Sequence, residues 1–75
     1  MQTIFKKHQK VKILRLPDAE YIEPAEGKED AKIEAGMYGK INLFLPNGQY
    51  HVEILDEKGK TLAYAPFSED DIEAA

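Results

Sequence analysis

Two histidines, one serine and fourteen acidic residues are the main side chains in this 75-residue sequence that could take part in catalysis. Nucleophilic catalysis requires a nucleophile, a base beside it and a third group that orients the base. The sequence has no cysteine, and its single serine, Ser68, precedes three acids in the pattern of a helix N-cap. We therefore expect no catalytic residue and predict that the protein is not an enzyme.

Metal and cofactor sites are also not expected. His8 and His51, with Glu53 or Asp56 near the second, follow no spacing that is typical of metal ligands. The glycine pair Gly36–Gly39 lacks the third glycine and the strand-then-helix context of a dinucleotide-binding loop. We predict no cofactor, no metal and a structural role for these glycines.

Basic residues crowd the start of the chain and suggest an alternative function. Residues 1–16 contain no acid and five basic residues, which are Lys6, Lys7, Lys10, Lys12 and Arg15. With Tyr38 or Phe44 nearby, such a stripe would resemble the surfaces with which small barrels bind nucleic acid. The pI of about 5.1 counts against this partner, because acidic segments would compete for the same lysines. A solvated basic strand is the simpler interpretation.

The acids are concentrated in two later segments of the chain. Residues 17–35 carry seven acids against two lysines, and residues 56–75 carry six acids against two lysines, within a net charge of -4. The segment from 18 to 35 also loses all apolar alternation, and Pro24 and Gly27 interrupt it. We predict a long acidic loop here, held to the body of the domain by Tyr21, Ile22 and Ile33.

Alternating apolar residues predict strands on both sides of this loop. Residues 10–16 alternate before Pro17, with Val11 and Ile13 on the inner side. Ile41, Leu43 and Leu45 precede Asn47-Gly48, and Tyr50, Val52 and Ile54 follow it, which predicts a hairpin whose turn needs positive φ angles. A second turn at 56–59 leads to a third strand, with Leu62 and Tyr64 on the apolar face and an end at Pro66. A short helical turn then follows Ser68, and Ile72 returns to the core.

The order of these elements predicts an all-β fold in a single domain over residues 1–75. A flat sheet would leave Val11 and Ile13 without cover, whereas a sheet curled on itself lets all inner faces share one core. We predict a small SH3-like barrel of about five strands with one long acidic loop and a short helical turn near the C-terminus.

The C-terminal half, from Gly36 to Glu73, resembles a family of short bacterial domains of unknown function that have SH3-like folds. The shared pattern is Gly-x-x-Gly-x-(Val/Ile), a glycine turn, Tyr-x-Val-Glu, Asp-x-x-Gly and a final acidic-apolar step, matched here by Gly36, Gly39, Ile41, Gly48, Tyr50, Val52, Glu53, Asp56, Gly59 and Ile72. More distantly, the stretch from Lys10 to Arg15 is similar to the start of an SH3-like accessory protein of photosystem I. The resemblance implies an accessory role in a bacterial protein.

Alternation also places several large apolar side chains opposite the predicted core. These are Leu14, Leu16, Phe44 and Leu55. Either the acidic loop covers them or they form an exposed patch for a protein partner. We expect the loop to cover part of the set and Phe44 to be its most exposed member. The candidate partner-binding residues are therefore Phe44, Leu14, Leu55 and Tyr38.

The remaining expectations concern the setting of the domain. The absence of cysteine fits a reducing cytoplasm, and no apolar run reaches the ~18 residues of a membrane span. We predict a cytoplasmic protein-interaction or accessory module with no membrane contact, as a monomer or a weak homodimer.

Overall fold

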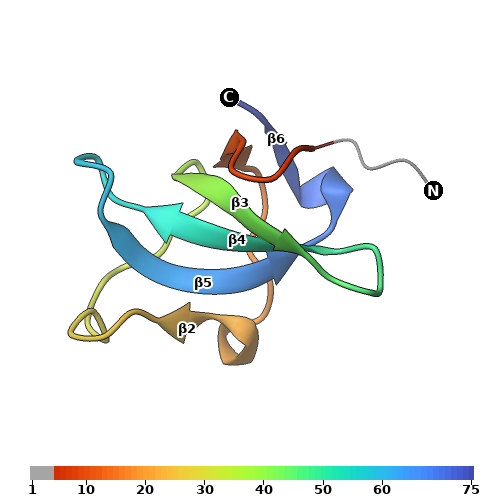
Figure 1. Ribbon diagram of the computed structural model, residues 1–75. Coiled ribbons are helices and arrows are strands. Elements are labelled where there is room, and N and C mark those ends of the chain that lie inside the picture. The colour runs from red at the N-terminus through yellow and green to blue at the C-terminus, as the bar shows by residue number, and fades with distance from the viewer. Residues whose placement is uncertain (1–4) are drawn as a thin grey trace.

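The structure is a computed structural model that describes residues 5–75, and in this range it contains six strands and two 3-10 turns (Figure 1). Residues 1–4 of the predicted domain lie outside the described residues. The strands are β1 (Lys10–Ile13), β2 (Glu23–Pro24), β3 (Tyr38–Phe44), β4 (Tyr50–Leu55), β5 (Thr61–Phe67) and β6 (Ile72–Ala74); the turns are η1 (Ala19–Tyr21) and η2 (Glu69–Asp71). The predicted all-β class is confirmed, together with the helical turn near the C-terminus.

The six strands form one open antiparallel sheet in the order β2-β5-β4-β3-β1-β6. Strands β3, β4 and β5 are the predicted meander, and β1 lies beside β3. The count exceeds the predicted five because β6 pairs with β1 and because the predicted loop contains a two-residue strand, β2. Neither short strand has enough residues to show alternation in the sequence.

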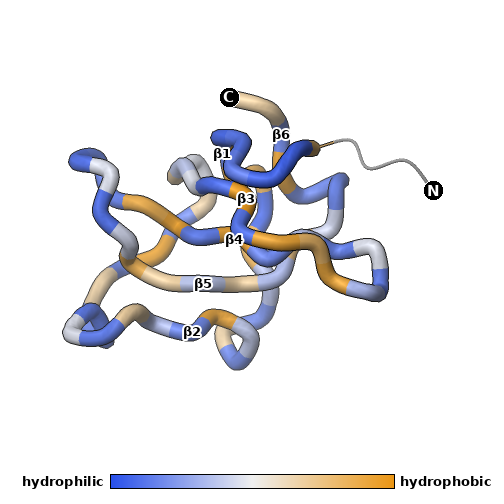
Figure 2. Tube along the Cα trace, viewed as in Figure 1, coloured by the Kyte–Doolittle hydropathy of each residue, from blue (hydrophilic) through white to orange (hydrophobic). Residues whose placement is uncertain are grey.

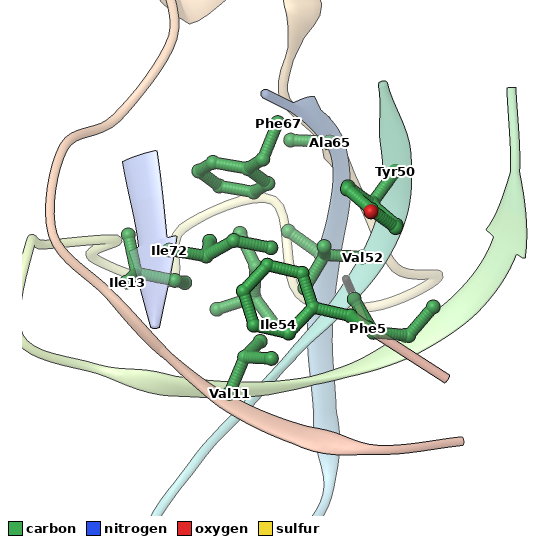
Figure 3. Close-up of a cluster of buried hydrophobic side chains, with 11 residues drawn as sticks. Phe5, Val11, Ile13, Tyr50, Val52, Ile54, Ala65, Phe67 and Ile72 are labelled. Carbon is green, nitrogen blue, oxygen red and sulfur yellow. The ribbon is translucent and has the colours of Figure 1, made fainter. Parts of the chain in front are cut away.

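The sheet is coiled strongly enough to enclose a single core (Figure 3). Three strands separate β5 from β6 in the sheet, yet Phe67 of β5 and Ile72 of β6 belong to the same buried cluster. The other members of the cluster are Phe5, Val11, Ile13, Ile41, Tyr50, Val52, Ile54, Ala63 and Ala65. Phe5 was not predicted in the core, because it stands alone in a basic segment without periodicity.

A β-bulge in β3 reverses the face of its last residues. Ile41 pairs with Val52, but the next pairs are Leu43 with His51 and Phe44 with Tyr50, so Asn42 is the extra residue. Leu43 consequently points to the outer face of the sheet, and Phe44 lies on the inner side beside Tyr50. The prediction that Leu43 points inward and Phe44 outward is therefore wrong, because alternation was extended across an irregularity that has no sequence signal.

A second irregularity changes β5. Ile54 pairs with Ala63 and Leu55 with Thr61, which makes Leu62 the extra residue. The inward residues are Ala63, Ala65 and Phe67, whereas Tyr64 was predicted on the apolar face and instead pairs with the outward Glu53. The strand also continues through Pro66, which was predicted to end it.

The two hairpin turns share one construction. In the β3–β4 turn the Gly48 amide donates to the Leu45 carbonyl (3.2 Å), and in the β4–β5 turn the Gly59 amide donates to the Asp56 carbonyl (3.0 Å). Gly48 and Gly59 have φ values of 82° and 83°, as in three-residue loops that end in a left-handed residue. The predicted positive φ is thus confirmed for Gly48 but not for Asn47, whose Oδ1 accepts a hydrogen bond from the Gln49 amide.

The acidic segment from 18 to 35 is partly ordered against the sheet. Its β2 pairs with β5, and the Ala25 amide donates to the Leu62 carbonyl at 2.9 Å. Ile22 and Ile33 pack against the core, as predicted. Tyr21 does not, because its side chain is 57% exposed.

Candidate docking surfaces

The four predicted partner-binding residues do not form one patch. Tyr38 and Leu55 are cross-strand partners on the outer face of the sheet, in a row that continues to Lys12 on β1. Leu14 follows β1, and its amide donates to the carbonyl of Asp71, the last residue of η2. Phe44 lies on the inner side, at the hairpin end of the sheet. Leu16, predicted to point outward, packs against the core.

Phe44 is the most informative of these residues because it joins an exposed surface to the core. Its ring meets the ring of Tyr50 edge-on, with 5.7 Å between centroids, and Phe5 contacts the same tyrosine at 5.3 Å. Tyr50 is 4% exposed, whereas Phe44 is 43% exposed. The acidic segment does not cover Phe44, which stays open to solvent. Residues of this segment line a separate hollow together with Leu62. Phe44 is thus held by the core on one side and exposed to solvent on the other.

A groove of about 720 Å³ runs beside Phe44, between the β3–β4 turn and η2. Figure 2 shows the end of β3 as a hydrophobic stretch where it enters this turn. The groove, here called the Phe44 groove, is lined by Phe44, Leu45, Pro46, Asn47, Gly48, Gln49, Tyr50, Ser68, Glu69 and Asp70. Its charged lining residues are both acidic, and both are exposed.

Asp71 holds the η2 wall of the Phe44 groove in place. The Arg15 Nε donates to its Oδ1 at 2.9 Å, and the Ser68 hydroxyl donates to its Oδ2 at 3.0 Å. Its backbone carbonyl also accepts the Leu14 amide hydrogen. Ser68 precedes the turn as predicted, but its side chain makes no capping bond to a backbone amide. These contacts tie η2 to the end of β1 and present Glu69 and Asp70 to the groove.

The five predicted nucleic-acid residues are spread over three places. Lys10 and Lys12 lie on the outer face, Arg15 is bound to Asp71, and Lys6 and Lys7 belong to the turn before β1. Lys12 has Glu73 as its cross-strand partner. Lys10 places its Nζ 5.0 Å from the centroid of the Tyr38 ring. The outer face therefore mixes both signs of charge.

A second groove, of about 560 Å³, lies on the other side of the same hairpin end. Here called the Tyr21 groove, it is lined by Glu20, Tyr21, Ile22, Glu23, Pro24, Leu45, His51, Tyr64, Ala65 and Pro66. The imidazole of His51 stacks on the Tyr64 ring, with 5.7 Å between centroids and 17° between planes. The sequence did not point to these residues, because Tyr21 comes from a segment without periodicity and Tyr64 was predicted to face inward.

The chain has no significant match among protein-family models, curated proteins or solved structures. Within residues 5–75, no group of three or more histidines and acids is arranged to hold a metal ion. The same residues include no helix that is long and apolar enough to cross a membrane.

Proposed function

We propose that this protein is a non-catalytic protein-interaction or accessory module that docks a partner segment in the Phe44 groove. The observation that carries the proposal is the half-exposed Phe44 ring seated edge-on against the buried Tyr50. An aromatic side chain that is fixed by the core loses little freedom when a partner covers it. Aromatic residues in such positions often supply much of the binding energy of an interface.

We also propose that the domain is a small SH3-like barrel of the bacterial type that its C-terminal half resembles, and that it acts in the cytoplasm. A β3–β4–β5 meander, with β1 beside it in a coiled sheet, supports this assignment. A monomer or weak homodimer is the assembly we expect, because the exposed apolar residues are scattered rather than gathered into one large face.

A peptide-display selection tests the docking proposal even though the partner is unidentified. Immobilised wild-type protein and the Phe44→Ala variant are each panned against the same random dodecapeptide library. Phe44→Ala is a suitable comparison because the Phe44 side chain is only partly buried. Thermal unfolding of the variant checks that it is folded. Tyr38→Ala, a similarly exposed aromatic on the outer face, serves as the matched control.

The proposal predicts a family of related peptides that is enriched on the wild type and on Tyr38→Ala but lost on Phe44→Ala. Equal enrichment on all three proteins would show that binding occurs elsewhere. Absence of any enriched family would count against a peptide-docking role.

A further inference from the structure

We propose that the Tyr21 groove is a binding site for a cationic side chain, with arginine as the preferred occupant, presented by a protein partner. The inference gives the partner of the proposed function a chemical identity, and it rests on that function for its biological setting. It concerns a different groove, so the two proposals fail separately.

Two of the rings that line the groove form an aromatic pair. His51 and Tyr64 stack nearly parallel on neighbouring strands. The side-chain amide of Asn42 is hydrogen-bonded to His51 Nδ1 at 3.1 Å. The bulge residue of β3 therefore holds the imidazole in place.

Tyr21 adds a third aromatic ring to the lining of the groove, and this ring is not packed in the core. Its side chain is 57% exposed, the largest exposure among the large hydrophobic residues of the described chain. The backbone of Tyr21 is held by its amide, which donates to the Asp18 carbonyl at 2.9 Å. A tyrosine whose backbone is held in place and whose ring is exposed is available to stack on a ligand.

The charge around this aromatic pair is negative. Glu20 and Glu23 line the groove, and no lysine or arginine is among its lining residues. Glu23 is the cross-strand partner of Tyr64, so the two residues are neighbours on the same face of the sheet. Phosphate groups would be repelled here, which excludes a nucleic-acid backbone as the occupant of this groove.

Aromatic faces next to carboxylates are the surroundings that a guanidinium group prefers. Its planar cation stacks on tyrosine and imidazole rings, and its fork of donors pairs with carboxylate oxygens. A lysine ammonium group would contribute its charge but neither a planar stacking face nor a fork of donors. Leu45 lines both grooves, so a segment docked at Phe44 would pass close to the Tyr21 groove.

The test is an NMR titration of the ¹⁵N-labelled full chain with N-acetyl-arginine methylamide. N-acetyl-citrulline methylamide, which has the same shape without the charge, is the control ligand, and the lysine analogue compares the two cations. We expect saturable shifts of the amides of residues 20–23, 51 and 64–65 with the arginine probe. The citrulline probe should bind at least about threefold more weakly, and the lysine probe should fall between them.

Two variants connect these shifts to the groove. Tyr21→Ala should weaken the arginine probe about threefold to fivefold, because one stacking face is lost while the backbone contact remains. Tyr38→Ala, which removes an exposed tyrosine that already has Lys10 over its ring, should leave the affinity unchanged. Thermal unfolding of both variants checks that they are folded.

The inference is overturned by any of three results: no shift with the arginine probe, equal shifts with citrulline, or equal affinity in Tyr21→Ala and the wild type. Shifts confined to residues 68–70 would also overturn it and would indicate attraction by the other acids. None of these results bears on the display selection against Phe44→Ala. Conversely, a failed selection with the expected NMR shifts would leave a cation site without a docking role at Phe44.

Discussion

At the scale of single residues, Gly39 shows how closely two strands approach in this small sheet. A Cβ atom at Gly39 would lie 2.6 Å from Val52 Cγ1 and 2.8 Å from the Glu53 carbonyl oxygen. The second contact is with backbone, which cannot move without disturbing the β3–β4 ladder. The glycine was predicted to be structural, and the reason proves to be close packing against β4.

We predict that Gly39→Ala lowers the free energy of unfolding by about 2 to 3 kcal/mol, as overpacked core positions do. The control is Gly48→Asn. A Cβ atom at this position would have no other atom within 4 Å, and asparagine tolerates the left-handed conformation of Gly48. That variant should lose less than about 1 kcal/mol. Urea unfolding measures both, and an unchanged midpoint for Gly39→Ala would show that the strands are farther apart than the structure places them.

At the scale of elements, the bulge in β3 decides which side chains reach the Phe44 groove. Without Asn42 as an extra residue, Leu43 would point inward and Phe44 outward. With it, Phe44 packs on Tyr50 and the outer face gains Leu43. A five-residue alternating run predicts a strand but carries no information about where a bulge interrupts it.

The bulge can be tested by comparing two apolar residues on the same strand. Leu43→Ser should change the unfolding free energy by less than about 0.5 kcal/mol, because Leu43 is 41% exposed on the outer face. Ile41→Ser, at a position with no exposed surface, should cost several-fold more because it buries a hydroxyl and leaves a cavity. Similar losses from both changes, in chemical denaturation, would contradict the bulge.

The β4–β5 turn depends on an ionised Asp56. Its Oδ1 accepts the amide hydrogens of Lys58 and Lys60, both at 2.8 Å. The hydrogen bond from Lys60 is the main cause that lowers the pKa of Asp56 below its ordinary value of 3.8. Stabilisation by this carboxylate is therefore complete above that ordinary value and is lost as the pH falls through the lower folded-state value.

The corresponding prediction compares the wild type with Asp56→Asn across pH. The wild type should have the higher urea midpoint near neutral pH, and the advantage should shrink as the pH falls below about 4. Each midpoint is read by circular dichroism at a series of pH values. A difference that stays constant through the acid range would show that the charge of Asp56 does not contribute.

At the scale of the whole molecule, the sequence predicted the fold class better than it predicted the surface. Alternation and turn residues predicted the all-β class, the meander and most of the core, including Val52 and Ile72. The candidate site was predicted only in part, since Phe44 was chosen for an outward direction that it does not have. The Tyr21 groove depends on β2 and on two bulges, and no local sequence pattern predicts these features.

The distribution of charge also belongs to this scale. Lys12 faces Glu73, Arg15 is bound to Asp71, and Lys40 lies 3.9 Å from Glu53, so acids interrupt the basic surface. We predict no retardation of single-stranded RNA or DNA in gel shifts at micromolar protein and ~50 mM salt. Binding that disappears when Lys6, Lys7, Lys10 and Lys12 are all changed to Glu would instead support the nucleic-acid alternative.

Docking at the Phe44 groove is tested most sharply by chemical-shift mapping with a peptide that the wild type enriches. We predict that the largest amide shifts fall on residues 44–50 and 68–70, the two walls of the groove. Shifts centred on residues 6–15 would be incompatible with docking there, because they would place the interaction surface on the basic strand.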